Sequence, residues 1–330
     1  MRRKLLSQHA NATIYRYDVA ISCGNLGYVL PDEKYDEAVT LLQEAIRLGE
    51  LLSAESPQMP RYRHKLGQAY RSLGDRLSSK EIAKAEKYLN KANETFSRLT
   101  KDLPRNPKYR RFLVYTLDRL AYVNFNLGRL PIAERYYREA VANLKKLTAD
   151  FSGVAEFQRE RAAGQIALGR FLGLAGKLKE SLETLHQAQK NLVKLDQDAP
   201  NNANIEQDLL RTHDRLARAL AFWAPAEQRD LKRALEHARK ATAGDENEIA
   251  YQLTLSMVHY RLGNFEAALR GLRTDDIEHC FLLAMTKKKL KDDKEARRMF
   301  KLGMSLLNKE RLPNFELKVL QREAKRVLGQ

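Results

Sequence analysis

The chain has 330 residues, of which 43% are hydrophobic and 31% charged, and its formal net charge is +17. This balance is ordinary for amphipathic helices and excludes a low-complexity or largely disordered chain. The two cysteines, Cys23 and Cys280, are far apart and without CxxC spacing, so neither a disulfide framework nor a zinc site is indicated. No apolar run approaches the ~20 residues that span a bilayer, and the basic start lacks the apolar stretch of a secretory signal. A cytoplasmic protein without membrane contact is expected.

The positive charge is concentrated in two regions of the chain. Residues 61–112 carry 15 Lys and Arg against 5 Asp and Glu, a net +10, and residues 249–330 carry 17 against 10, a net +7. Such regions attract anions of any kind, including acidic protein segments and nucleic acid. The alternative is that these charges are solvated helix faces that keep a long protein soluble.

A frame of 47 or 48 residues recurs along the chain. An aromatic or apolar residue opens each copy, at Tyr15, Tyr62, Tyr109, Phe157 and Ile205. Eleven residues later a leucine is followed by Gly or Ala, and the second half of each copy carries alternating small and apolar residues at helical spacing. A fixed period of this length predicts helical hairpins that bury their apolar stripes by stacking. We expect an all-α, right-handed α-solenoid of about six to seven hairpins that forms one continuous domain.

The start of the chain matches the end of a repeat. Leu5 precedes Tyr15 by ten residues, as Leu52 precedes Tyr62. Residues 1–12 are therefore either the tail of an incomplete repeat in a longer array or an N-terminal cap. If they are a repeat's tail, the first complete pair, 13–55, should expose apolar surface on its N-terminal side. Five long repeats are expected, at about 13–60, 61–107, 108–155, 156–203 and 204–247.

Proline and glycine mark the ends of the expected helices. Pro60 and Pro107 stand in turns between repeats, because proline lacks the backbone donor and disfavours helix in the residue before it. Gly128, Gly176 and Gly263 each stand five residues before the first small residue of a second helix. Glycine just past a helix end suits a left-handed C-terminal cap.

The frame becomes irregular in the last third of the chain. The turn of the fifth repeat is lengthened at 221–227, and two shorter hairpins are expected over 248–312. The final segment, 313–330, contains a helix from about Phe315 to Leu328. Its charged positions suit a C-terminal capping helix with one face in water.

The small residues of each repeat carry a family resemblance. Leu73-Gly74 is followed by Ala85, then Leu89 and Ala92, and the other long repeats share this order. The arrangement resembles the tetratricopeptide repeat, whose usual period is 34 residues; the longer period here is read as longer helices. The resemblance covers nearly the whole chain and implies an interaction scaffold.

A finer resemblance concerns the end of the chain. The long repeats that end in Leu-x-x-acid-x-Pro, the segments 280–285 and 295–297, and the closing 320–324 are similar to the C-terminal tetratricopeptide tails of planctomycete-type bacterial serine/threonine protein kinases. That family implies a kinase domain N-terminal to the array. The sequence contains no GxGxxG loop, His-Arg-Asp loop or Asp-Phe-Gly, so phosphoryl transfer is carried over to no residue. On this resemblance the chain is the interaction part of such a protein, or a free-standing relative.

Arginine follows the aromatic residue in the first three repeats, at Arg16, Arg63 and Arg110. Stacking should align these arginines along the solenoid, where a guanidinium fork can bind carboxylate or phosphate. The alternative is that they cap helices or pair with acids of the adjacent repeat.

The densest basic run is 287–301. Its first members, Lys287, Lys288, Lys289 and Lys291, are further candidates for partner binding. A basic run contacts phosphates with salt-dependent affinity, but this one has no interleaved aromatic residue until Phe300 and no RNA-recognition signature.

The sequence therefore predicts a non-catalytic protein–protein interaction scaffold that binds a peptide or helical segment of acidic character in the solenoid groove. The alternative is nucleic-acid or polyanion binding through 61–112 and 287–301. No paired histidine spacing and no GxSxG elbow is present, so no enzymatic activity, metal or cofactor is expected.

Overall fold

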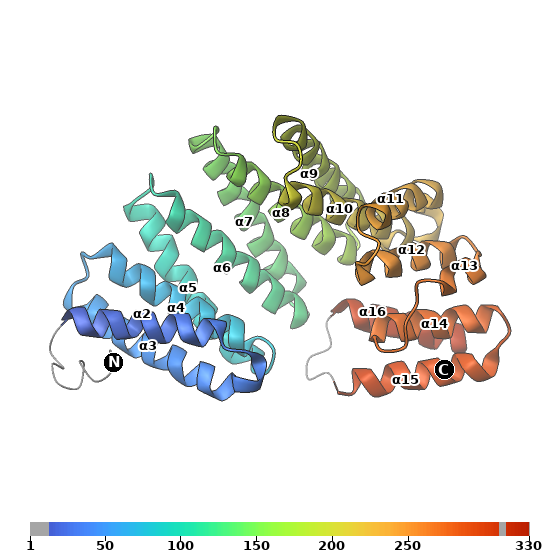
Figure 1. Ribbon diagram of the computed structural model, residues 1–330, viewed down its shortest axis with the longest axis horizontal. Helices are drawn as coiled ribbons and strands as arrows, with labels where there is room; N and C mark the ends of the chain where they lie inside the picture. Colours follow the sequence, from blue (N-terminus) through green and yellow to red (C-terminus); the bar gives the residue numbers. More distant parts are fainter. Residues whose placement is uncertain (1–12, 310–314, 330) are drawn as a thin grey trace. The chain divides into compact units, whose positions relative to one another are not determined.

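A computed structural model describes residues 13–309 and 315–329 of the chain (Figure 1). Within these ranges the regular elements are helices, with no strand, and consecutive helices pack as pairs. This confirms the predicted all-α fold class of stacked helical hairpins. The incomplete repeat or cap expected at 1–12 lies outside the described residues.

The helices group into two compact units, residues 1–150 and 151–330, where the sequence period predicts one continuous domain. Each repeat of a solenoid contacts only its neighbours, so an array divides easily between two repeats. The described part of the first unit consists of three helix pairs. They are α2 (Thr13–Val29) with α3 (Tyr35–Glu55), α4 (Pro60–Leu77) with α5 (Ile82–Asp102), and α6 (Pro107–Asn126) with α7 (Leu130–Asp150).

The second unit contains two long pairs, two short pairs and a final helix. The pairs are α8 (Ala155–Leu174) with α9 (Leu178–Asp198), α10 (Ala203–Arg218) with α11 (Leu231–Gly244), α12 (Ile249–Arg261) with α13 (Phe265–Leu269), and α14 (Ile277–Lys289) with α15 (Asp293–Leu307); the final helix is α16 (Phe315–Leu328). A π-helical turn, Ala219–Trp223, and a 3-10 turn, Ala226–Gln228, lengthen the link between α10 and α11. The lengthened turn agrees with the sequence prediction.

Each long pair is built on a buried stripe of small and apolar residues. In α5 this stripe has no exposed surface and consists of Ala85, Leu89, Ala92, Phe96 and Leu99. Gly74 of α4 faces it, and a Cβ atom at Gly74 would lie 2.6 Å from Cγ of Leu89. The two helices approach this closely because glycine places no side chain at the crossing point. The register assigned from the sequence is confirmed here.

The first pair exposes one apolar face. Leu73 and Leu120, the leucines before the small residue in the second and third repeats, have no exposed surface. Leu26, at the same position of the first repeat, is 45% exposed, and Ile14 and Val29 of the same helix are 66% and 68% exposed. Whether residues 1–12 are the tail of a repeat or a cap stays a prediction.

Left-handed residues end several first helices. Gly128, Gly176 and Gly263 have φ angles of +75°, +80° and +79°, which confirms the predicted caps. The residue after each of these glycines donates its N–H to a carbonyl in the last turn of the helix, at 2.8 to 3.0 Å. This is the Schellman arrangement, which satisfies carbonyls that a helix end leaves unpaired.

Lys291 holds the same position after α14. Its φ angle is +62°, and the next residue, Asp292, donates its N–H to the carbonyl of Lys287 at 3.0 Å. The left-handed region brings Cβ close to the following carbonyl, which costs a residue other than glycine roughly 1–2 kcal/mol. The last short hairpin therefore contains a strained cap.

Two histidines meet between α10 and α11. Nδ1 of His213 lies 2.7 Å from Nδ1 of His237, so one ring donates and the other accepts a hydrogen bond. Burial lowers the pKa of each ring to about 4, and nearby positive charges, including Lys240, add to the effect. The pair is therefore neutral near neutral pH.

Replacing Gly74 by alanine should destabilise the protein by about 1–3 kcal/mol, because the new methyl group overlaps Leu89. Gly24→Ala is the matched control, since a Cβ there meets only Ala45, at 3.7 Å, and alanine is favoured over glycine in a helix interior by roughly 0.5–1 kcal/mol. Urea denaturation followed by circular dichroism measures both. Equal stabilities of the two variants would contradict the packing described above.

Lys291→Gly should stabilise the protein by about 1 kcal/mol, because glycine adopts the left-handed conformation without the steric cost. Lys291→Ala removes the same charge but keeps the Cβ atom, and it should bring no such gain. The measurement is the thermal unfolding midpoint of both variants. A gain shared equally by the two would assign the effect to charge and not to the backbone.

The His213–His237 pair should make the protein less stable as the pH falls from about 6.5 to about 4. Histidine titrates near 6.5 in an unfolded chain and near 4 in this pair. Between these values the unfolded chain binds more protons, so acid favours unfolding, and the full contribution is present above 6.5. The double variant His213→Asn, His237→Asn should show a flatter dependence in urea titrations at several pH values. Some dependence should persist, because burial lowers the pKa of His64 to about 3.

An unchanged pH dependence in the double variant would remove this pair as a source of acid sensitivity.

Candidate functional site

The arginines of the predicted ladder are engaged in ion pairs at one end of the first unit's helix pairs. Each pairs with the carboxylate that ends the second helix of its own pair. These ion pairs are Arg16–Glu55 at 2.6 Å, Arg63–Asp102 at 2.7 Å, and Arg110–Asp150. An antiparallel pair brings the start of the first helix next to the end of the second, where a cation and an anion are each opposed by the dipole of their own helix. The contact therefore closes each pair.

These pairs lie within a repeat, whereas the sequence suggested pairing with the adjacent repeat as the alternative to partner binding. Two of the three arginines, Arg16 and Arg110, have side chains only 14% and 11% exposed. A carboxylate of a partner protein would have to displace the carboxylate that already pairs with each of these arginines. Partner binding by Arg16, Arg63 and Arg110 stays a prediction.

The predicted basic run is only partly free. Lys287 and Lys288, in the last turn of α14, reach the two aspartates before and at the start of α15, at 3.9 and 2.8 Å. Lys289 and Lys291 are exposed and form no ion pair with any residue that the structure describes. Lysine at a helix C-terminus is also favoured by the helix dipole. Partner binding by these four lysines likewise stays a prediction.

A groove opens in the first unit between α2 and α4. It encloses a cavity of about 230 Å³. The side chains that define it include Tyr17, Ile21 and Tyr28 of α2, Tyr62, Lys65, Gln68 and Arg71 of α4, and Phe112 of α6. The groove thus combines aromatic walls with basic groups, and it draws on three successive repeats.

Lys65 is a cation without a counter-ion in this groove. Its side chain is partly buried, and no carboxylate in the described part of the chain pairs with it. Burial lowers its pKa, and the neighbouring Lys108 lowers it further. Arg71, by contrast, pairs with Asp75 at 2.8 Å. A partly buried, unpaired charge is unfavourable, so the groove favours an added anion near Lys65.

Arg61 adds a second cation at the edge of the groove. Its guanidinium carbon lies 5.5 Å from the ring centre of Tyr17 and 4.9 Å from that of Tyr62, and it donates a hydrogen bond to the Tyr62 hydroxyl at 3.0 Å. A guanidinium over aromatic rings keeps its remaining N–H donors available. Arg61 and Lys65 together can bind a carboxylate beside an apolar side chain.

The sequence did not single out Arg61 or Lys65. Its only signal was the charge excess over 61–112, which includes both. The ladder arginines recur once per repeat and can therefore be recognised in the sequence. Arg61 and Lys65 do not recur, so no sequence pattern identifies them.

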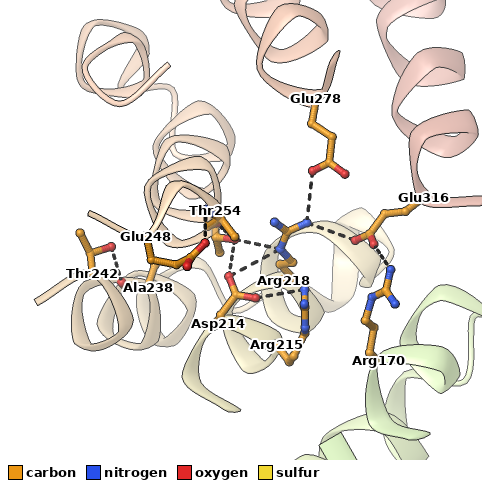
Figure 2. Close-up of polar contacts among 11 residues, drawn as sticks. Arg170, Asp214, Arg215, Arg218, Ala238, Thr242, Glu248, Thr254, Glu278 and Glu316 are labelled. Carbon is orange, nitrogen blue, oxygen red and sulfur yellow. Dashed lines mark hydrogen bonds and ion pairs between the residues drawn. The ribbon is translucent and has the colours of Figure 1, made fainter. Parts of the chain in front are cut away.

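A buried ion network surrounds Arg218 in the second unit (Figure 2). Arg218, at the end of α10, pairs with Asp214 at 3.6 Å, Glu278 at 3.7 Å and Glu316 at 3.1 Å, and it donates to the Thr254 hydroxyl at 2.8 Å. Its side chain is 5% exposed. Burial alone would lower its pKa, but the three carboxylates outweigh burial and the pKa is raised. The guanidinium therefore stays charged in the interior.

Two glutamates of α16 extend the network. Glu316 also pairs with Arg170 of α8 at 2.6 Å (Figure 2), and Glu323 pairs with Arg261 of α12 at 2.5 Å. The helix that the sequence predicts as a cap thus lies against arginines of three other helices. The sequence did not identify these residues, because they are joined only by long-range contacts.

Residues 13–309 and 315–329 contain no group of three His, Cys, Asp or Glu arranged to hold a metal ion. No helix in these ranges is long and apolar enough to cross a membrane. Cys23 and Cys280 are both buried and form no disulfide.

The solved structures similar to this chain include the following three. The apo form of RapI has a TM-score of 0.62 at 13% identity, with 99% of this chain and 89% of that one covered. A tetratricopeptide repeat protein from Parabacteroides merdae ATCC 43184 has a TM-score of 0.53 at 11% identity, covering 96% and 99%. BtubC from P. vanneervenii has a TM-score of 0.53 at 17% identity, covering 72% and 87%. At these identities the likeness concerns the fold.

A family model described as tetratricopeptide repeat matches residues 113–146. This segment covers most of α6 and α7, one of the long helix pairs. A search of curated protein sequences finds no match. The repeated frame, the close-packed helix pairs, the family model and the similar structures agree. Residues 113–146 thus match the tetratricopeptide repeat family model, and the fold of the chain is similar to that of solved tetratricopeptide repeat proteins.

Proposed function

We propose that this protein is a non-catalytic interaction scaffold whose first unit binds an acidic peptide segment in the groove between α2 and α4. The observation that carries the proposal is Lys65, a partly buried cation that faces the groove and has no counter-ion among residues 13–309 and 315–329. Stacked repeats provide a preformed surface, so a peptide binds without ordering the scaffold first.

The shape of the groove agrees with a peptide as the ligand. Its volume of about 230 Å³ is below the roughly 300–1,000 Å³ typical of pockets for drug-sized molecules. It suits one or two apolar side chains, which would contact Tyr17, Tyr28 and Phe112. A carboxylate next to them on the peptide would reach Lys65 and Arg61. The expected ligand is an extended segment that alternates acidic and apolar residues.

Polyanion binding through 61–112 and 287–301 is the alternative. Several of the positive charges in 61–112 are paired within the protein: Arg63 and Arg110 pair as described above, and Arg71 and Arg76 pair with Asp75 and Asp32 at 2.8 and 2.7 Å. Affinity for a phosphate backbone comes from many free cations that displace counter-ions. The pairing therefore favours the peptide over nucleic acid.

The similarity of 280–285 and 320–324 to kinase tails extends the proposal to signalling. In that setting the scaffold would select a partner for a kinase domain on the same or another chain. This extension is supported by the sequence resemblance alone. Sequencing the gene segment upstream of the coding region for this chain tests it: a segment that encodes a kinase domain would support the extension.

Lys65→Met should weaken binding of a fluorescein-labelled peptide of alternating Glu and Phe by about tenfold, equivalent to ~1.4 kcal/mol. The reason is that a carboxylate of the peptide loses the partly buried cation with which it pairs. Fluorescence anisotropy at fixed salt measures the affinity. Lys87→Met is the matched control: it removes the same charge from an exposed position of α5 outside the groove. The unliganded Lys65→Met variant should also unfold at a higher temperature than the wild type, because an unpaired, partly buried cation is gone.

Equal affinities for the Lys65→Met and Lys87→Met variants would exclude this groove as the peptide site. A labelled single-stranded RNA that binds more tightly than the peptide, and weakens steeply with salt, would favour the polyanion alternative.

A further inference from the structure

α16 does not extend the stack of repeats. A helix that follows a pair normally packs mainly on the second helix of that pair, as α4 does on α3 and α6 does on α5. α16 instead packs mainly on α14, the first helix of its pair, and little on α15. Its side chains reach α8, α10 and α12 as well. It therefore covers the face formed by the first helices of the second unit.

Acidic residues on one side of α16 meet a row of arginines on this face. Glu316 and Glu323 are seven residues apart, which is two turns and places them on the same side of the helix. Their partners, Arg170, Arg218 and Arg261, come from three successive helix pairs. Both glutamate side chains are mostly buried by the contact. The face thus recognises carboxylates at a fixed spacing along a helix.

An apolar contact accompanies the charged one. Leu320 and Ala324 of α16 are buried in a cluster with Met257 of α12 and Phe281 of α14. The side of α16 that carries Glu316 and Glu323 therefore also carries apolar residues. This combination defines the chemistry that the face accepts, an amphipathic helix with an acidic edge.

α16 leaves part of the face unfilled. A cavity of about 160 Å³ remains beside it, lined by Phe222, Trp223 and Met257 of the face and by Val319 and Leu320 of α16. The atoms that line a void lack van der Waals partners on that side, so the packing energy of those contacts is lost. A helix with a larger side chain at the position of Val319 would fill the cavity and bind more tightly.

We propose that this face is a docking site for an acidic amphipathic helix of a partner protein, and that α16 is an intramolecular competitor that occupies it in the free protein. Without α16, Arg170, Arg218 and Arg261 would lose the carboxylates of Glu316 and Glu323, so the uncovered face would be more positive and would favour an acidic ligand. This proposal is independent of the groove in the first unit.

The test uses the full chain and a fluorescein-labelled peptide with the sequence of residues 315–329 as the probe. The wild-type protein should bind it weakly, because α16 already fills the site. The double variant Glu316→Gln, Glu323→Gln weakens the docking of the internal helix and should bind the probe at least about tenfold more tightly. A probe with Val319→Phe should bind more tightly still, and a probe with both glutamates replaced by glutamine should lose binding.

The matched control is the double variant Lys318→Gln, Arg322→Gln, which changes two exposed charges of the same helix and should bind the probe as weakly as the wild type. Trp223 is the only tryptophan and lines the cavity with Val319, so its emission reports on α16. Emission should shift to longer wavelength in the glutamate variant and return when the probe is added.

A glutamate variant that binds the probe no more tightly than the wild type would overturn the proposal and leave α16 as a structural part of the fold. If helicity shows that the double variant does not fold, the comparison is made with Glu323→Gln alone, which leaves the ion pairs of Arg218 intact. The same criterion then applies. Tighter binding of the probe by this variant than by the wild type supports the docking site, and an unchanged affinity overturns it.

Discussion

The close approach of two helices at a glycine is the contact on which the rest of the structure depends. A Cβ atom at Gly27, Gly74 or Gly169 would lie 2.6 to 2.7 Å from a leucine of the paired helix, so these three pairs are held at the same spacing. The third pair has Ala121 at this position, fully buried. Pairs of equal geometry stack with their first helices in register. Residues at equivalent positions then form rows, and the rows become binding surfaces.

In our proposals, the two units each bind an acidic segment, but the two surfaces are in different states. In the first unit the groove between α2 and α4 contains Lys65, which no carboxylate of the described part of the chain pairs with. In the second unit the cations Arg170, Arg218 and Arg261 are matched by glutamates of α16. Both surfaces are suited to acidic, partly apolar segments. One is open, and the other is filled by the chain's own C-terminal helix.

Buried ion pairs of this kind specify an arrangement more than they stabilise it. Taking charges out of water costs several kcal/mol per ion, and their attraction repays this only with good geometry. Arg218 makes three ion pairs and a hydrogen bond to Thr254, which suits a contact that must form in one register. Removing a single partner would leave a buried charge uncompensated. The placement of α16 is therefore specific and, in our proposal, reversible.

The sequence by itself determined the helical class, the repeat and much of the helix punctuation, because these depend on residues near one another in the chain. Apolar spacing identified the buried stripe from Ala85 to Leu99, and glycine identified the caps at Gly128 and Gly176. Only the tertiary structure decided which charges are paired. Arg63 meets an acid 39 residues away, and Arg170 meets one 146 residues away. A periodic pattern places a side chain on its own helix, but the partner depends on how separate helices pack, and that is set by the sum of many weak contacts.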